Sequence, residues 1–215
     1  MVSDTAYFVS PSAGPGPGVL VLHSWWGLNG FFRRLADRLA DEGYTVLVPD
    51  LNFGEVFEDA DQAREHLESA DADRLAGLTL TSAQLLQEKA ADPGSPVAVV
   101  GFSMGASLGL WASVRIPQVI GSVAAFYGSQ SIDFAGSRAE YQIHLADRDA
   151  WVDPDEAAFM EATIGLEERP VEVHRYPGTE HWFFEQGVDT HHPEAADLAW
   201  NRLMGFLGRN LPATS

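Results

Sequence analysis

The 215-residue chain contains no cysteine. Disulfide bonds, thiolate metal sites and a cysteine nucleophile are therefore excluded. Basic residues are also scarce: 13 Lys+Arg stand against 31 Asp+Glu, and the formal net charge at pH 7 is −18. Binding to the phosphate backbone of nucleic acid, or to an anionic membrane surface, depends on clustered Lys and Arg. The charge argues against both kinds of partner.

Long hydrophobic runs are absent as well. The first apolar run, Val19–Leu22, is too short for a signal peptide, and no stretch approaches the roughly 20 apolar residues of a membrane-spanning helix. Hydrophobic residues nevertheless make up 46% of the chain and aromatic residues 11%, which is enough for a large core. We expect a soluble, cytoplasmic protein with one folded domain over residues 1–215.

Short apolar segments alternate with amphipathic ones along the chain. Strands are expected at 19–22, 45–48, 97–100, 119–126, 142–145 and 171–176, and helices at 31–42, 74–90, 104–115, from about 154 and from 193. In the last helix, Leu198, Leu203, Met204 and Leu207 are expected to face inward. The alternation predicts a mostly parallel sheet with helices on both faces. In such sheets, functional residues lie in the loops beyond the carboxyl ends of the strands.

Residues 55–73 contain eight acids and one base, Arg64. Two interpretations are open. The segment can be a solvated helix and loop face, which is the ordinary reading of such charge, or a rim that attracts cations around a pocket.

The motif Gly101-Phe102-Ser103-Met104-Gly105 stands directly after an expected buried strand and directly before an expected helix. This G-x-S-x-G context predicts a sharp turn that projects the serine hydroxyl above the sheet, with glycines allowing the strand and helix to approach closely. The backbone N–H of Met104, at the start of the helix, would point toward a bound carbonyl. We therefore expect Ser103 to be a nucleophile.

A serine nucleophile needs a base, which on this fold follows the acid in chain order. His181 lies in the loop after the last expected strand and is the best candidate. His174 falls inside that strand, and His191 and His192 resemble a polar turn. His23 is expected to order the loop after the first buried strand rather than to act as a base.

The acid should lie in the loop after the strand at 142–145. Asp147 is too close to the strand end, Asp153 and Glu156 form a capping box for the next helix, and Asp155 falls in its first turn. Asp149 remains as the expected acid. The short separations among the three catalytic positions leave no room for a large lid domain.

Further motifs resemble the dienelactone hydrolase family of α/β-hydrolases, from about residue 18 to 207. They are Gly27–Asn29, Gly43-Tyr44, Val48-Pro49-Asp50-Leu51, the G-x-S-x-G turn (the nucleophile elbow) with Gly101 and Gly105, Phe126-Tyr127-Gly128, the loop around Asp149, and Tyr176-Pro177-Gly178 followed by His181 and Phe183. The resemblance implies an α/β-hydrolase fold and a triad of Ser103, Asp149 and His181. It also implies an oxyanion hole formed by the backbone N–H groups of Trp25 and Met104.

The sequence departs from the family's namesake enzymes at three positions. Those enzymes have a cysteine where this chain has Ser103, a glutamate where it has Ser24, and an arginine that holds the substrate carboxylate where it has Glu185. A substrate carboxylate would meet Glu185 and an acidic surface. These departures favour a serine esterase on the same scaffold over true dienelactone hydrolysis.

Aromatic residues stand beside the expected catalytic turns. The candidate pocket residues are Ser24, Trp26, Trp151, Trp182 and Phe183. Core packing explains such aromatics equally well, but a pocket that they line would be apolar and would prefer uncharged acyl or aryl groups.

The sequence thus predicts a serine hydrolase that acts on small, uncharged or apolar carboxylic esters. A lactone or thioester hydrolase is the alternative, because one triad serves every acyl transfer. A non-catalytic binding module is disfavoured, since it has no need of all three groups. No metal or cofactor is expected, and the protein is expected to be a monomer or homodimer.

Overall fold

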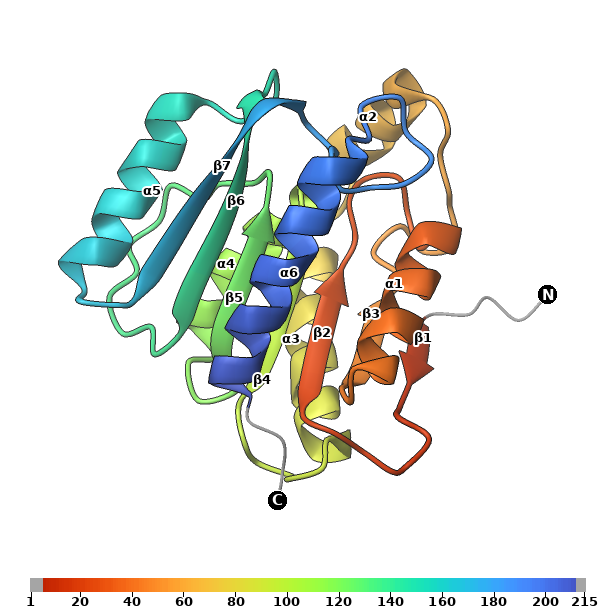
Figure 1. Cartoon of the computed structure of the whole chain (residues 1–215), viewed down its shortest axis with the longest axis vertical. Helices are drawn as coiled ribbons and strands as arrows, with labels where there is room; N and C mark the ends of the chain where they lie inside the picture. The colour runs from red at the N-terminus through yellow and green to blue at the C-terminus, as the bar shows by residue number, and fades with distance from the viewer. Residues whose placement is uncertain (1–5, 212–215) are drawn as a thin grey trace.

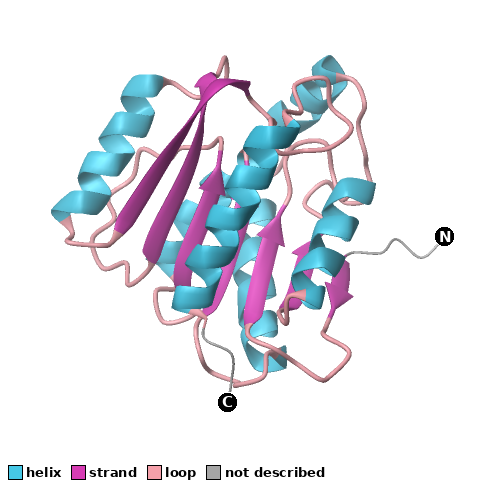
Figure 2. Cartoon of the chain, viewed as in Figure 1, coloured by secondary structure: helices cyan, strands magenta, loops and turns pink. Residues whose placement is uncertain are grey.

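The computed structural model describes residues 6–211, which form one seven-stranded sheet flanked by six helices (Figures 1 and 2). The strands are β1 (Ala6–Val9), β2 (Gly18–Leu22), β3 (Thr45–Pro49), β4 (Val97–Phe102), β5 (Ile120–Phe126), β6 (Glu140–Arg148) and β7 (Val171–Glu180). The helices are α1 (Gly30–Asp41), α2 (Ala60–Glu68), α3 (Ala72–Lys89), α4 (Met104–Arg115), α5 (Pro154–Leu166) and α6 (Pro193–Asn210).

The strand order is β1-β3-β2-β4-β5-β6-β7. All neighbours are parallel except β1, which pairs antiparallel with β3 at the edge. Every residue of β2, β3 and β4 is buried, as expected for strands covered on both faces. The chain thus has the α/β-hydrolase architecture expected from its sequence, with no large additional domain among the described residues.

Two hydrophobic clusters lie on opposite faces of the sheet. Helices α1 and α6 cover one face, where Phe32, Leu35 and Leu203 are buried. Helices α3, α4 and α5 cover the other, where Leu86, Leu110 and Met160 are buried. The alternation of side chains along each strand supplies both clusters from the same segment of sequence.

The structure corrects several local expectations. Strand β1 was not expected, and β6 and β7 extend beyond the predicted ends. Helix α2 lies within residues 55–73, for which a solvated helix and loop face was one interpretation. Leu198 of α6 is 46% exposed, whereas Leu203 and Leu207 are buried. Five residues advance an α-helix by about 140° beyond a full turn, so Leu198 cannot share the face of Leu203.

The capping box expected at α5 is only half formed. Asp153 does cap the helix, and its side chain accepts a hydrogen bond from the backbone N–H of Asp155. The Glu156 side chain does not return to the cap; it is within 3.4 Å of the Ser129 hydroxyl instead.

Close contact between β2, β4 and α4 depends on glycine. A Cβ at Gly105 would lie 2.2 Å from the Leu22 carbonyl oxygen, and one at Gly101 would lie 2.5 Å from the Gly105 oxygen. These contacts are with backbone, which cannot move aside without shifting a strand. Both glycines of the motif are therefore required by packing.

We predict that Gly105→Ala lowers the free energy of unfolding by at least about 1–3 kcal/mol, because an added methyl group overpacks the junction. Gly77→Ala is the control: Gly77 lies within α3 with open space around it, and alanine there should stabilise by about 0.5–1 kcal/mol. Urea denaturation measures both, and equal effects of the two substitutions would contradict the packing argument.

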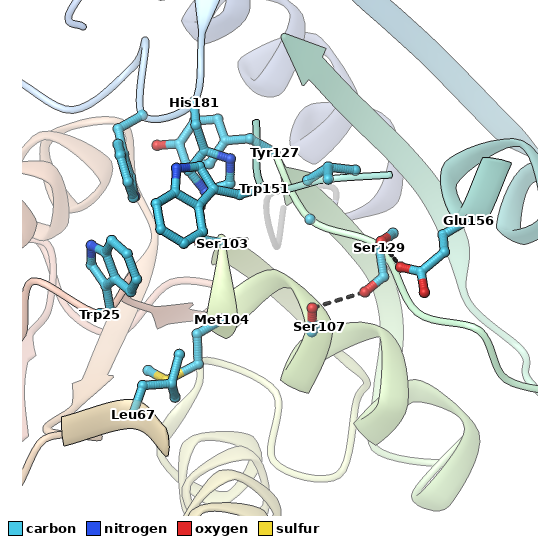
Figure 3. Close-up of a pocket in the computed structure, with 13 residues that line it drawn as sticks. Trp25, Leu67, Ser103, Met104, Ser107, Tyr127, Ser129, Trp151, Glu156 and His181 are labelled. Carbon is cyan, nitrogen blue, oxygen red and sulfur yellow. Dashed lines mark hydrogen bonds between the residues drawn. The ribbon is translucent and has the colours of Figure 1, made fainter. Parts of the chain in front are cut away.

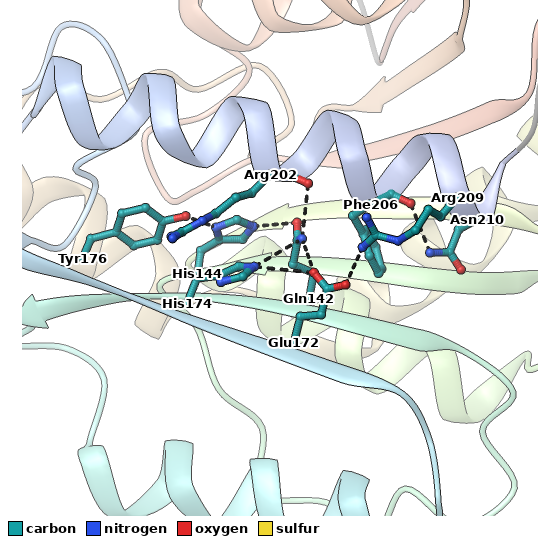
Figure 4. A network of polar contacts seen from close by, with 9 residues as sticks. All are labelled: Gln142, His144, Glu172, His174, Tyr176, Arg202, Phe206, Arg209 and Asn210. Atoms are coloured by element: carbon teal, nitrogen blue, oxygen red, sulfur yellow. Dashed lines mark hydrogen bonds and ion pairs between the residues drawn. The ribbon is translucent and has the colours of Figure 1, made fainter.

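A polar network joins α6 to strands β6 and β7 (Figure 4). Buried His144 contacts the Tyr176 hydroxyl through Nδ1 at 2.6 Å and the Gln142 side-chain oxygen through Nε2 at 2.9 Å. Gln142 also contacts the Arg202 carbonyl oxygen of α6. Burial, with His174 and Arg202 nearby, holds the pKa of His144 well below its ordinary value of 6.5.

This lowered pKa predicts acid sensitivity. Above pH 6.5, His144 is neutral in both the folded and unfolded chain; below it, only the unfolded chain gains the proton, so stability falls as pH drops. His144→Gln should weaken the dependence of unfolding free energy on pH below 6.5. Denaturation of both proteins at pH 7.5 and 5 tests this. If the unfolding free energy of His144→Gln falls with pH as steeply as that of the wild-type protein, His144 is not the source of the acid sensitivity.

Within residues 6–211, no helix combines the length and hydrophobicity needed to cross a membrane.

Candidate active site

Ser103 occupies the turn between β4 and α4 in a left-handed backbone conformation, with φ 53° and ψ −116°. Such a conformation costs a non-glycine residue about 1–3 kcal/mol and persists only where its surroundings enforce it. Here the Ser103 N–H donates to the Phe126 carbonyl at 2.9 Å, and its own carbonyl accepts from Ala106 and Ser107 of α4. The turn holds the hydroxyl above the carboxyl end of the sheet.

The side chains of Ser103, His181 and Asp149 form one hydrogen-bonded chain. His181 Nε2 is 2.8 Å from Ser103 Oγ, and its Nδ1 is 2.8 Å from both carboxylate oxygens of Asp149. His181 is 4% exposed. Since an ionised carboxylate only accepts hydrogen bonds, Nδ1 carries the proton and Nε2 is free to accept that of the serine.

Sheet register places the acid beside the base. Arg148, the last residue of β6, pairs with Glu180, the last residue of β7, so Asp149 and His181 follow paired positions on adjacent strands. Asp149 is further fixed by the backbone N–H groups of Trp151 and Val152, at 2.9 and 3.1 Å. These contacts orient the carboxylate toward the imidazole.

The other acids and histidines weighed as candidates have separate structural contacts. Asp147 accepts the Gly178 N–H. His174 lies in β7 within the polar network, His191 contacts the Phe183 carbonyl, and His192 caps α6. Among residues 6–211, no group of three or more His, Asp or Glu side chains is arranged to hold a metal ion.

The segment after β2 is fixed from behind by buried polar side chains. His23 accepts the Leu51 N–H through Nε2 at 2.9 Å, so its Nδ1 donates to the Ser24 carbonyl at 2.7 Å. Burial lowers the pKa of His23 to about 4, which keeps it neutral. Asn52 donates to the Trp25 carbonyl at 2.7 Å. His23 thus orders this segment, as expected, and Asn52 is a support that sequence reasoning missed.

A cavity of about 260 Å³ opens beside Ser103 (Figure 3). It is lined by aromatic and apolar side chains, the catalytic candidates and a few polar groups: Trp25, Leu67, Ser103, Met104, Ser107, Tyr127, Gly128, Ser129, Trp151, Val152, Glu156, His181 and Trp182. The rings of Trp25, Trp151 and Trp182 lie 4.8–5.8 Å apart and form a continuous wall.

Trp151 and Trp182 therefore line the cavity, but Ser24, Trp26 and Phe183 do not. Phe183 is fully buried against Tyr127 and Tyr176. Trp26 lines a neighbouring cavity of about 760 Å³ instead. These residues stand beside the expected turns, but they are not among the residues that line the cavity with Ser103.

The prediction that a substrate carboxylate would meet Glu185 is also wrong. Glu185 is 1% exposed and does not line the cavity with Ser103. Its carboxyl group accepts hydrogen bonds from Ser24 and Tyr127, at 2.8 and 2.9 Å. Burial raises its pKa to about 8. The acid that does line the cavity is Glu156.

The eight acids of residues 55–73 are all exposed, in agreement with a solvated face. Two of them, Asp59 and Asp71, cap helices α2 and α3. The segment still reaches the site, because α2 places Leu67 in the cavity wall. Its contribution there is an apolar side chain, which the charge pattern did not reveal.

The sequence matches the model of the Dienelactone hydrolase family over residues 5–211. It is 29% identical over 210 residues to "Protein usf" of Aquifex pyrophilus, covering 93% of this chain and 90% of that protein. It is 26% identical over 201 residues to a putative carboxymethylenebutenolidase of Aquifex aeolicus, covering 89% and 87%.

Solved structures share the fold. A putative dienelactone hydrolase from Klebsiella pneumoniae superposes with a TM-score of 0.82 at 21% identity, over 95% of this chain and 92% of that one. The dienelactone hydrolase-like promiscuous phosphotriesterase P91, from metagenomic libraries, gives 0.80 at 22% identity, over 95% and 92%. With the family match spanning nearly the whole sequence, the chain belongs to the dienelactone hydrolase family, and it is a hydrolase.

Proposed function

We propose that the protein is a serine esterase that cleaves small carboxylic esters by acyl transfer through Ser103, His181 and Asp149. The observation that carries the proposal is the unbroken hydrogen-bonded chain from Asp149 through His181 to Ser103, beside a cavity whose lining includes three indole rings. This is the arrangement that activates a serine hydroxyl, which is otherwise a weak nucleophile.

The reaction starts when Ser103 Oγ attacks the ester carbonyl carbon and His181 Nε2 accepts the hydroxyl proton. Asp149 holds the imidazole in position and stabilises its positive charge. When the tetrahedral intermediate collapses, the proton passes from His181 to the departing alcohol. Water, deprotonated by His181, then attacks the acyl carbon of the acyl-serine. As the second tetrahedral intermediate collapses, the bond to Ser103 Oγ breaks, His181 returns the proton to that oxygen, and the carboxylic acid is released.

Charge on the carbonyl oxygen would be stabilised by the backbone N–H groups of Trp25 and Met104. No hydrogen bond within residues 6–211 uses either group as a donor, so both are available to a ligand. Met104 is the first residue of α4, where the helix dipole favours negative charge. One such donor contributes about 2.7–4 kcal/mol to transition-state stability in a well-studied serine protease.

The cavity favours small, apolar acyl or alcohol groups. The indoles, Leu67 and Met104 supply apolar surface, and no Lys or Arg is among the lining residues. Several relatives are named as carboxymethylenebutenolidases, for example in Rhodococcus opacus, which makes lactone hydrolysis the second candidate. Thioesters are accessible to the same chemistry. We propose that the enzyme needs no cofactor, since a triad suffices for acyl transfer. The proposal also includes a cytoplasmic location and action as a monomer or homodimer.

We predict that Ser103→Ala lowers kcat for p-nitrophenyl acetate by on the order of 10⁵–10⁶-fold, as removal of a serine nucleophile does in other triad enzymes. Ser107→Ala is the matched control, because Ser107 lines the same cavity but donates its hydroxyl to the Ser129 carbonyl. Thermal denaturation should show both variants folded. Near wild-type turnover by Ser103→Ala would eliminate the proposed mechanism.

Substrate charge provides a second prediction. Glu156 should repel a carboxylate-bearing ester, so kcat/KM for an anionic ester should lie below that of its neutral isostere, and salt should narrow the difference. Glu156→Gln should raise kcat/KM for the anionic ester several-fold and leave kcat/KM for the neutral ester unchanged, since one exposed charge contributes up to about 1 kcal/mol.

Asp155→Asn, which removes the same charge one residue away without lining the cavity, controls for net charge. Equal effects of the two variants, or faster hydrolysis of the anionic ester by the wild-type protein, would contradict the role of Glu156.

A further inference from the structure

We propose that Glu185 is a positioning residue, whose side chain ties the segment that carries the oxyanion-hole N–H of Trp25 to the loop that carries His181. The inference rests on the proposed function and extends it to a group outside the substrate cavity. It concerns a position where the family's namesake enzymes have a residue of opposite charge.

The two oxygens of Glu185 make separate contacts with distant parts of the chain. Oε2 accepts the hydroxyl of Ser24, 161 residues earlier, at 2.8 Å. Oε1 accepts the hydroxyl of Tyr127, 58 residues earlier, at 2.9 Å. Ser24 directly precedes Trp25, and Tyr127 directly follows β5. One carboxyl group therefore connects loops that follow three different strands.

The loop that carries Glu185 is itself firmly held. The Glu185 N–H donates to the Trp182 carbonyl at 2.8 Å, closing a turn directly after His181. Thr190 donates its hydroxyl to the His181 carbonyl at 2.6 Å, and the His192 N–H donates to the Phe183 carbonyl at 2.9 Å. Because these bonds hold the loop together, the contacts of Glu185 also restrict the position of the His181 backbone.

Tyr127 links the carboxyl group to the imidazole more directly. Its ring centroid lies 4.9 Å from that of His181, and its backbone N–H donates to the His144 carbonyl at 2.7 Å. Its backbone is in the left-handed region, with φ 38°. Since the side chain also lines the cavity, the hydroxyl bond to Glu185 fixes one wall of the site as well as one side of the histidine.

The charge state of Glu185 suits this role. The titratable groups around it are Tyr127, whose pKa is raised well above 10, with His181 and Asp149 beyond the tyrosine ring. Burial raises the pKa of Glu185 to about 8. At neutral pH it is a neutral hydrogen-bonding group, and it adds no negative charge beside an oxyanion. In the neutral form one oxygen of Glu185 carries the proton and donates it to the hydroxyl that it contacts, while the other oxygen still accepts, so both contacts remain.

Three variants separate positioning from bulk structure. Glu185→Gln keeps the shape and the hydrogen-bonding capacity, Glu185→Ala removes both contacts, and Asp189→Asn removes an exposed acid from the same loop as a control. We expect Glu185→Ala to lower kcat for p-nitrophenyl acetate about 10²–10³-fold, the effect of losing one oxyanion donor, with KM changed less than about three-fold. Glu185→Gln and Asp189→Asn should retain kcat at pH 7 within about three-fold.

The pH profile is a readout that packing alone would not move. Above pH 8 the wild-type carboxyl group ionises and must be hydrated or left as a buried charge, so kcat should decline there. In Glu185→Gln this decline should disappear, while Asp189→Asn should keep it. A decline of equal size in Glu185→Gln overturns the proposal, as does a folded Glu185→Ala with wild-type kcat.

Hydrogen exchange keeps the test independent of esterase activity. Amides of residues 23–28 should exchange at least about ten-fold faster in Glu185→Ala than in the wild-type, Glu185→Gln and Asp189→Asn proteins. Unchanged exchange in Glu185→Ala overturns the cross-link even if the protein hydrolyses esters. Conversely, a wild-type protein that hydrolyses no ester refutes the proposed function, while faster exchange would still support the cross-link.

Discussion

The site depends above all on the left-handed backbone of Ser103. No serine adopts this conformation freely, and here the junction of β2, β4 and α4 enforces it. That junction exists because Gly101 and Gly105 leave no Cβ between the strand and helix backbones. The strained turn puts the hydroxyl above the sheet, and helix α4 begins at the next residue, Met104, whose backbone N–H is the proposed oxyanion donor.

Sheet geometry positions Asp149 and His181. Parallel strands end at the same edge, so loops that are far apart in sequence meet there. The pairing of Arg148 with Glu180 puts Asp149 and His181 side by side, and the turn between β4 and α4 brings Ser103 to them. Sheet geometry brings the side chains of Ser103, Asp149 and His181 within hydrogen-bonding distance, although they are 32 to 78 residues apart in sequence. Other long-range bonds surround these side chains, and we propose that those of Glu185 to Ser24 and Tyr127 hold them in position.

Features that depend on local sequence could be predicted from the sequence alone, whereas long-range side-chain contacts could not. Buried strands and the elbow have local signatures, so the fold and the position of Ser103 could be predicted, and Asp149 could be chosen because its neighbours had structural roles. Side-chain direction within a loop has no such signature: Trp182 reaches the cavity, whereas Phe183 next to it enters the core. The contacts of Glu185 join residues up to 161 positions apart, and no local pattern encodes them.

Net charge alone also says little about site electrostatics. Glu156 is an exposed acid on the cavity wall, where we propose that it repels anionic esters. Glu185 is enclosed, its pKa is raised to about 8 by burial, and its oxygens form hydrogen bonds with two hydroxyl groups. The overall charge of −18 describes the surface that a substrate approaches. The local environment decides what each carboxyl group does.

The central claim is that Ser103 forms a covalent intermediate, and covalent trapping tests it most directly. After reaction with a fluorophosphonate, peptide mapping by mass spectrometry should find one phosphonyl group per chain, on Ser103, and none in protein denatured beforehand. Modification confined to another residue, or a native protein left unmodified by excess reagent, would contradict the account.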